Sequence, residues 1–211
     1  MALISELPAK VIERLSLYRQ LLLKYIFSKG PHISSADLSR LTGATQESVR
    51  RDLMLIGCQS SNIRKGYHVK EMIKCIDSVL NPFDICRMAL VGDNDAFTET
   101  FLYEYENEKI RLVAVFDFES VSEYTHRDDI ARFRFDELHD TIRNLDIKLV
   151  LLNVPGAYTR QTADILIKAG VRGIINLSPV HLETDRIYVE NLNMITAIEK
   201  AAFFMKWRQY V

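Results

Sequence analysis

Four short apolar runs in the second part of the chain constrain its fold more than any other feature. Each has the length of a strand and is bounded by charge, Gly or Pro: RMALVG at residues 87–92, RLVAVFD at 111–117, KLVLLNVP at 148–155 and VRGIINLSP at 171–179. Runs without polar alternation predict strands buried on both faces, and helix-like stretches such as residues 159–170 separate them. The pattern predicts an α/β unit with a Rossmann-like, doubly wound parallel sheet, to which residues 186–193 add a strand.

Residues 9–79 instead have the periodicity of short helices. Ser34 or Ser35 is suited to begin a two-turn helix that ends at Gly43, and Thr45 is suited to cap the following helix, QESVRRDLMLIG at residues 46–57. Two short helices joined by a tight turn, after a longer first helix, match the helix-turn-helix pattern. This part of the chain therefore resembles a reader of duplex DNA.

A small hairpin is predicted after these helices. Arg64, Lys65 and Gly66 form a basic tip, and Tyr67 and Val69 then alternate with polar residues. Together with the helix pair, the hairpin predicts a winged-helix domain.

The domain boundary is predicted at Asn81-Pro82, which interrupts the periodicity. We expect a winged-helix DNA-binding domain at residues 1–80, a Rossmann-like domain at 81–193 and a dimerisation helix at 194–211. Charge follows this division, because residues 1–78 carry 12 Lys and Arg against 7 Asp and Glu, while residues 79–211 carry 15 against 21. Such asymmetry favours a first domain that faces nucleic acid.

Candidate DNA contacts lie on the second helix of the pair. Gln46 and Ser48 are at its N-terminal end, which meets base edges in this motif, and Arg50 and Arg51 lie opposite its apolar face. Arginine binds guanine bidentately, glutamine pairs with adenine, and serine holds phosphates. The alternative is a helix face that is merely solvated.

The turn after the first predicted strand is a weak candidate for a phosphate-binding loop. Gly92 keeps the tight turn, but Asn94 and Phe97 stand where a dinucleotide-binding loop has two further glycines, and Asp93 and Asp95 bring negative charge. Asp117 ends the second strand 25 residues beyond Gly92, near the expected spacing of about 20 for an acid that holds a ribose hydroxyl. A simple turn residue is the alternative at this position.

Other chemistry has no clear candidate. The five histidines are scattered, the three cysteines form no CxxC pair, and no nucleophile elbow or Walker-type loop is present. No catalytic or metal-binding residues are predicted. Because no apolar run approaches the roughly 20 residues of a membrane span and no secretion signal is visible, we expect a cytoplasmic protein with reduced thiols.

The chain resembles the Rex family of redox-sensing transcriptional repressors along nearly its whole length. The matching segments include ISSADLSRLTGATQESVRRDL, RKGYHV, MALVG, VAVFD and LLNVPGAYTRQTADILIKAGVRGIINLSPVHL. The resemblance implies a homodimer in which a winged-helix domain reads a pseudo-palindromic operator, a Rossmann domain senses the NADH/NAD ratio, and the last helix is exchanged between subunits.

Site residues also follow from this resemblance. It implies DNA contacts for Arg50, Arg51, Arg64, Lys65 and Tyr67. It implies an NAD(H) site lined by residues at the ends of the strands, namely Gly92, Asp93, Asn94, Asp95, Ala96, Phe97, Asp117, Val154, Pro155, Ser178 and Pro179.

This chain departs from the family at the glycine-rich loop. The motif G-x-G-N-x-G falls on residues 92–97, where two of its three glycines are replaced. We therefore predict a sequence-specific DNA-binding regulator in which NADH sensing is weakened or lost. The alternatives are a repressor that still responds to NADH, an interaction module kept for dimerisation, and an NAD-dependent oxidoreductase, for which no acid or base is apparent.

Overall fold

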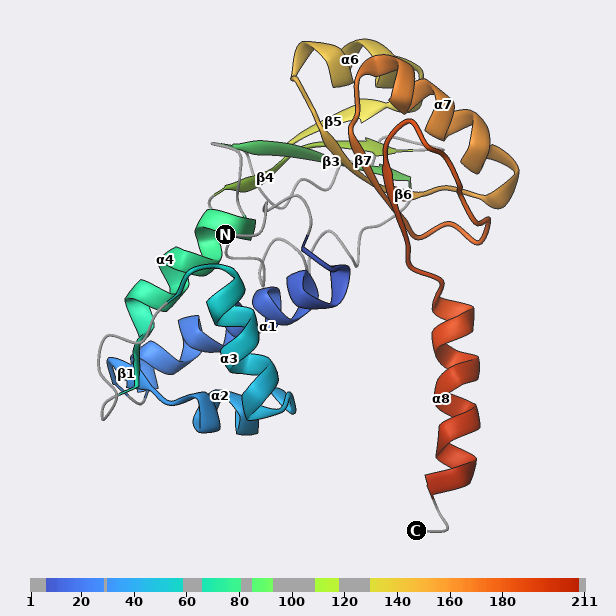
Figure 1. Cartoon of the computed structure of the whole chain (residues 1–211). Helices are drawn as coiled ribbons and strands as arrows, with labels where there is room; N and C mark the ends of the chain where they lie inside the picture. The colour runs from blue at the N-terminus through green and yellow to red at the C-terminus, as the bar shows by residue number, and fades with distance from the viewer. Residues whose placement is uncertain are drawn as a thin grey trace. The chain divides into compact units, whose positions relative to one another are not determined.

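The computed structural model describes residues 7–28, 30–58, 66–80, 85–92, 109–117 and 130–208 (Figure 1). The chain divides into two compact units, Met1–Asp84 and Ile85–Val211.

The N-terminal unit is a cluster of helices with a two-stranded sheet. Its elements are α1 (Ala9–Ser28), β1 (His32–Ile33), α2 (Ser35–Thr42), α3 (Gln46–Leu55), β2 (Tyr67–His68) and α4 (Val69–Leu80). The predicted apolar positions of α1, such as Leu15, Tyr18 and Leu22, are fully buried in a core that all four helices share.

Local capping explains why α2 and α3 are separate helices. Ser34 is the N-cap of α2 and forms a capping box with Asp37, while Gly43 ends the helix with a left-handed φ of 72°. The Thr45 hydroxyl then accepts a hydrogen bond of 3.1 Å from the backbone N–H of Ser48 and begins α3. The predicted helix pair and its caps are confirmed.

The described part of the wing differs from the expected simple hairpin. β2 pairs antiparallel with β1, so that Ile33 lies opposite Tyr67, and Val69 is already the first residue of α4. Gly66 has a φ of 80°, and a Cβ there would lie 2.5 Å from the carbonyl oxygen of Ile33. Gly66 therefore lets the chain pass close to β1. The predicted basic tip, Arg64 and Lys65, lies outside the described residues.

A buried carboxylate joins α1 to α3. Asp52 is 1% exposed, and it accepts hydrogen bonds of 2.7 Å from both Nε and Nη2 of Arg14 and of 2.9 Å from the Tyr18 hydroxyl. Burial, followed by the hydrogen bond to Asp52, raises the pKa of Tyr18, so the hydroxyl stays protonated and available as a donor. This network fixes the rotation of α3 about its own axis.

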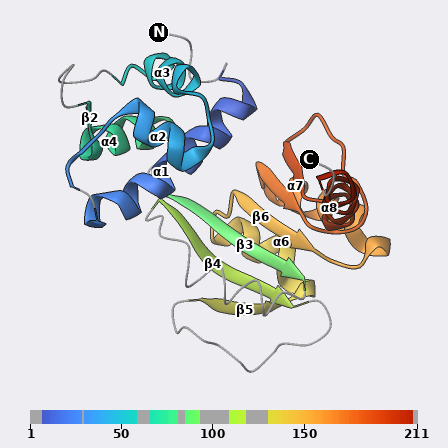
Figure 2. The same ribbon diagram turned by 90° about the horizontal axis from the view of Figure 1, so that it is seen from below.

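The C-terminal unit contains a six-stranded parallel sheet. Its strands are β3 (Cys86–Gly92), β4 (Ile110–Asp117), β5 (Ala131–Arg134), β6 (Leu149–Asn153), β7 (Gly173–Asn176) and β8 (Tyr188–Asn191). They lie in the order β5-β4-β3-β6-β7-β8, part of which is visible in Figure 2. This is the doubly wound order in which two halves meet between the first and fourth strands, and it confirms the predicted fold class. β5 was not predicted.

Each face of this sheet carries apolar side chains. On one face, Phe116 and Val150 pack with α6 (Leu138–Asn144) and α7 (Thr159–Ala169), which lie together above the sheet in Figure 1. Leu90 and Leu151 belong to a second cluster. Continuous apolar runs in the sequence are explained by these two layers, because alternate side chains of each central strand enter one or the other.

The last helix, α8 (Met194–Arg208), extends away from the sheet in Figure 1. Every side chain from residue 194 to residue 206 is exposed, including Ile198, Phe203, Phe204 and Met205. No helix among the described residues is long and apolar enough to cross a membrane.

Replacing Asp52 with Asn tests the role of the buried carboxylate. The substitution keeps the size of the side chain but leaves the Arg14 cation without its counter-charge, so we expect the free energy of unfolding of the N-terminal unit to fall by ~2–3 kcal/mol. Urea denaturation followed by circular dichroism measures it. The control is Glu47→Gln, which removes the exposed ion pair between Glu47 and Arg51 and should change stability by less than about 1 kcal/mol. Equal effects of the two substitutions would contradict the assigned role of Asp52.

Candidate nucleic-acid interface and nucleotide-binding edge

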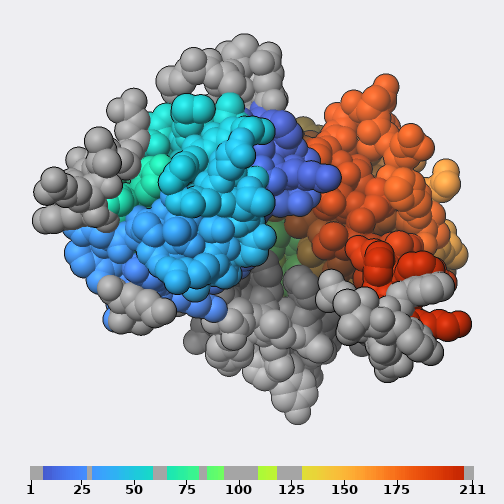
Figure 3. All heavy atoms as spheres, turned by 60° about the horizontal axis from the view of Figure 1, so that its bottom comes forward, coloured from blue at the N-terminus to red at the C-terminus, as the bar shows by residue number. Residues whose placement is uncertain are grey.

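The outer face of α3 is a line of exposed side chains. Glu47, Arg50, Arg51 and Met54 follow the spacing i, i+3, i+4, i+7, and Met54 is 74% exposed. The atoms of α2 and α3 form part of the surface of the N-terminal unit in Figure 3. Because Val49, Asp52 and Leu53 are buried on the opposite side, this outer face presents two arginines together, as the sequence predicts. Met54 was not among the predicted site residues, although the same helical spacing identifies it.

A buried hydroxyl sets the orientation of α3 on α2. Ser35 is 7% exposed, and its oxygen accepts hydrogen bonds of 3.0 Å from Nε2 of Gln46 and 3.2 Å from Nε of Arg50. The Ser48 hydroxyl lies 2.8 Å from that of Thr45 at the cap of the helix. Three of the predicted DNA-binding residues thus also have structural partners. Ser35, which the sequence suggested only as a possible cap of α2, is a residue that positions α3.

Tyr67 lies within the electrostatic reach of this helix. Burial and the neighbouring Cys58 raise the pKa of the Tyr67 hydroxyl, while the Arg50 cation opposes that rise. Tyr67 is therefore close enough to Arg50 for the two side chains to interact electrostatically.

Gly92 ends β3, the strand at which the order of successive strands in the sheet reverses. Its φ is 112°, and a Cβ at this position would lie 1.8 Å from the carbonyl oxygen of Asn153 at the end of β6. β3 and β6 are the neighbouring strands at which the order reverses, and open α/β sheets bind ligands at this position. The first glycine of the predicted loop is therefore required by the backbone itself. Residues 93–97, including Asp93, Asn94, Asp95, Ala96 and Phe97, lie outside the described residues.

The loops after β6 and β7 are joined at the same edge of the sheet. The buried backbone N–H of Val154 donates a 3.2 Å hydrogen bond to the Ser178 hydroxyl. A Cβ at Gly156 would lie 3.4 Å from the ring of Pro179. The structure thus brings together Val154 and Ser178, both buried, with the exposed Pro155 and Pro179, as expected for residues that line one edge.

The amides of two asparagines, of which Asn176 is buried, hold the loop after β7 in place. Asn176 Nδ2 donates to the Val180 carbonyl and to Asn191 Oδ1, each at 2.8 Å. Asn191 in turn accepts from the backbone N–H of Leu182 at 3.0 Å. This pair of asparagines ties β7 and β8 to the segment that contains Ser178 and Pro179, and neither asparagine was predicted.

Asp117 ends β4 beside this edge and already has an ionic partner. Arg132 Nη1 on β5 donates hydrogen bonds of 2.8 and 3.1 Å to its two carboxylate oxygens. Asp117 and Arg132 are only 11% and 9% exposed. Arg132 was not predicted as a site residue, because β5 itself was not recognised.

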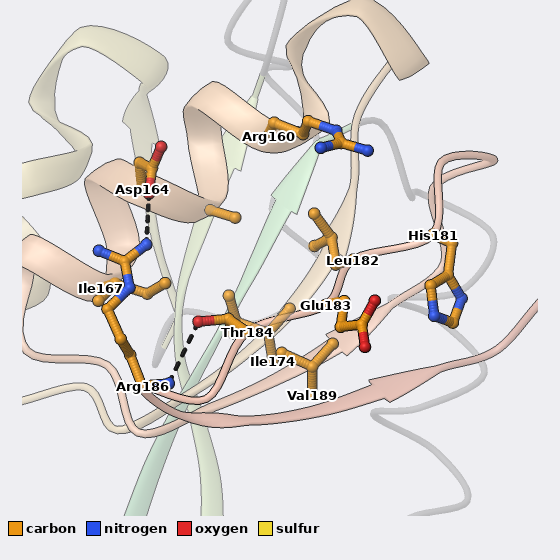
Figure 4. Close-up of a pocket in the computed structure, with 11 residues that line it drawn as sticks. Arg160, Asp164, Ile167, Ile174, His181, Leu182, Glu183, Thr184, Arg186 and Val189 are labelled. Carbon is orange, nitrogen blue, oxygen red and sulfur yellow. Dashed lines mark hydrogen bonds and ion pairs between the residues drawn. The ribbon is translucent and has the colours of Figure 1, made fainter.

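A separate pocket of about 160 Å³ lies between α7 and β7–β8 (Figure 4). Its floor is apolar, with Ile174, Leu182 and Val189, and Arg160 and His181 lie at its rim. None of the predicted cofactor-binding residues lines it. Within the described residues, no group of three or more His, Cys, Asp or Glu side chains is arranged to hold a metal ion.

Comparisons with known proteins agree with this architecture. Residues 6–53 match a family model described as "Putative DNA-binding protein N-terminus". The chain is 26% identical over 204 residues, 95% of both sequences, to the redox-sensing transcriptional repressor Rex from Streptococcus pneumoniae strains Hungary19A-6 and CGSP14. The chain is thus similar to the Rex repressors over almost its whole length.

Solved structures share this fold over almost the whole chain. The crystal structure of RSP, a Rex-family repressor, covers 97% of each chain with a TM-score of 0.80 and 23% identity. RSP in complex with β-NAD⁺ and operator DNA has a TM-score of 0.81 at 22% identity, covering 97% of this chain and 94% of the RSP chain. RSP with β-NADH has a TM-score of 0.80 at 22% identity and covers 97% of each chain.

Gly92→Ala tests the close approach of β3 and β6 in this parallel sheet. The added methyl group meets the Asn153 carbonyl in a backbone conformation that L-residues avoid, so we expect the free energy of unfolding of the C-terminal unit to fall by ~3 kcal/mol or more. Thermal denaturation measures the change. Gly170→Ala is the matched control, because its φ is 103° but its Cβ would meet open space. Its cost should be about 1–2 kcal/mol. A smaller loss for Gly92→Ala than for Gly170→Ala would refute the steric requirement.

Proposed function

We propose that this chain is a sequence-specific, DNA-binding transcriptional regulator of the Rex type in which NADH/NAD sensing is weakened or lost. The main observation behind this proposal is the exposed face of α3 that contains Arg50 and Arg51. This face points outward because Asp52, on the opposite side of the helix, is held in the core by Arg14 and Tyr18. Support also comes from the curated relatives, which are named redox-sensing transcriptional repressors and match 95% of both sequences. The proposal implies a cytoplasmic protein that acts on duplex DNA.

α3 has the chemistry of a recognition helix. In helix-turn-helix proteins the second helix enters the major groove with its N-terminal residues towards the bases. Gln46 and Ser48 are at that end, and Arg50 and Arg51 follow one turn later. The predicted wing residues Arg64 and Lys65 would add phosphate contacts beside Tyr67. A guanidinium binds a guanine edge with two hydrogen bonds, whereas lysine and serine hold the backbone.

The proposed loss of NADH sensing rests on the loop after Gly92 and on Asp117. Asp93 and Asp95 would bring carboxylates beside a negatively charged pyrophosphate. Two like charges within ~4 Å repel each other by on the order of 4 kcal/mol at an effective dielectric near 20, before screening by salt. Asn94 and Phe97 replace the two glycines that allow close approach. Asp117 is already ion-paired with Arg132. We propose no catalytic role, because the curated relatives are repressors.

We further propose a homodimer assembled through α8, with the helix exchanged between subunits. Its exposed apolar side chains include Ile195, Ile198, Phe203 and Phe204. A contiguous apolar surface of this kind is covered by a partner in soluble proteins. A two-fold dimer presents two α3 helices, which matches a pseudo-palindromic operator.

Alanine substitution of Arg50 and Arg51 tests the recognition helix. Each change should weaken binding to an operator, selected with this protein from a random duplex library, by ~1–3 kcal/mol if the arginine reads a base. Fluorescence anisotropy with the selected and a scrambled duplex separates base reading from phosphate contact, because loss of a phosphate contact weakens both duplexes alike and lowers the salt dependence. The control is Arg186→Ala, which removes an exposed arginine paired with Asp164 in the C-terminal unit. Unchanged operator affinity in both α3 variants would exclude α3 as the recognition helix.

Substitutions in α8 test the dimer. Replacing Phe203 and Phe204 together by Glu should convert the dimer to a monomer, because the four new charges per dimer cannot be buried without partners. Sedimentation velocity at micromolar concentration measures the assembly. Lys200→Glu changes the charge of the same helix without removing an apolar side chain and should leave the dimer intact. A dimer that survives the double Phe substitution would rule out α8 as its main interface.

A further inference from the structure

The ion pair between Asp117 and Arg132 occupies a position with a specific meaning in dinucleotide-binding folds. The acid at the end of the second strand accepts a hydrogen bond from the ribose 2′-hydroxyl of an adenosine. Asp117 ends β4, the second strand of this sheet, next to Gly92 on β3. Its two carboxylate oxygens instead accept hydrogen bonds of 2.8 and 3.1 Å from Arg132 Nη1.

The register of β4 and β5 places the Asp117 and Arg132 side chains on the same face of the sheet. Val115 lies opposite Arg132, and Asp117 lies opposite Arg134. Paired positions of neighbouring strands share a face, and positions two apart on one strand do so as well. Arg132 therefore lies opposite the position two residues before Asp117, on the same face of the sheet, and its side chain reaches the carboxylate from there. Arg134, on the same face, instead pairs with Asp136 at 3.2 Å, where both side chains are about 70% exposed.

A ribose hydroxyl competes poorly with such a partner. Arg132 and Asp117 are 9% and 11% exposed, so their hydrogen bonds are shielded from water. A ribose hydroxyl would also donate to an ionised acceptor, but Arg132 adds to its hydrogen bonds the attraction between two opposite charges, which is little screened at this depth. A neutral 2′-hydroxyl that displaced Arg132 would also break an ion pair in a nearly dry place, which is costly.

We propose that Arg132 is a specificity-determining residue that occupies the ribose-binding carboxylate, so that this chain does not recognise the 2′-hydroxyl of an adenosine ribose. The proposal deepens, and rests on, the proposed weakening of nucleotide sensing. The contacts that support it lie within β4 and β5, and residues 93–97 take no part in them. It predicts that removal of one guanidinium restores part of a nucleotide site.

Isothermal titration with ADP and 2′-deoxy-ADP tests this role. Arg132→Leu keeps an apolar stem but removes the cation, so it should bind ADP about tenfold more tightly than the wild-type chain, as expected for one regained hydrogen bond to a charged acceptor. The gain should disappear with 2′-deoxy-ADP, which lacks the hydroxyl. Arg134→Leu is the matched control, because it removes a neighbouring arginine from the same strand and face, and it should leave ADP affinity unchanged.

A second variant keeps the test decisive if Arg132→Leu fails to fold. Asp117→Asn retains the shape of the side chain, and it should leave the ADP affinity of the chain within twofold, because the carboxylate makes no ribose contact in the wild type. A tenfold loss in Asp117→Asn would overturn the proposal. So would the absence of a hydroxyl-dependent gain in folded Arg132→Leu.

The same titrations with 2′,5′-ADP distinguish a different use of Arg132. Tighter binding of 2′,5′-ADP than of ADP by the wild type, lost in Arg132→Leu, would identify Arg132 as a phosphate ligand and overturn the proposal. Operator binding of nucleotide-free Arg132→Leu should equal that of the wild type. Failure of the wild type to bind any operator would refute the proposed function as a DNA-binding regulator. The ADP titrations test the role of Arg132 independently of that result.

Discussion

A single buried carboxylate determines which side of α3 faces outward. Asp52 receives hydrogen bonds from Arg14 and Tyr18 on α1, and removal of a charge from water is tolerated only because these donors replace its hydration. Rotation of α3 by even one residue would break this network and bury a different set of side chains. With Asp52 inside, Arg50, Arg51 and Met54 are outside. The proposed DNA-reading face is thus a geometric consequence of a contact on the opposite side of the helix.

The C-terminal unit depends in a comparable way on one close approach. Gly92 passes so near the Asn153 carbonyl that no side chain fits, and this contact aligns the ends of β3 and β6 where a ligand would bind. The hydrogen bond from Val154 to Ser178 and the Asn176–Asn191 pair extend the same edge. The scaffold of a nucleotide-binding edge is therefore intact among the described residues, while Asp117 is paired internally. The sheet thus keeps the geometry of this edge, while the carboxylate at the end of β4 is paired with Arg132.

Sequence patterns identified the features that are local. The caps at Ser34 and Thr45 act over three residues, and the apolar runs of β3 and β6 report burial directly, so these elements could be predicted. β5 was missed because Arg132 and Arg134 interrupt its apolar pattern. Asp52 gave no signal of burial, since its partner Arg14 lies 38 residues away. The pairing of β2 with β1 was missed for the same reason, because the two strands are far apart in the sequence.

The central claim joins DNA reading to a weakened NADH response, and one titration tests both parts. The full-length chain is titrated against its selected operator by fluorescence anisotropy, at fixed salt, without nucleotide and with 1 mM NADH or NAD⁺ (about a thousandfold above micromolar affinity). We predict tight binding that prefers the operator over a scrambled duplex and changes less than twofold with either nucleotide. Equal binding to both duplexes, or release from the operator by micromolar NADH, would contradict the claim.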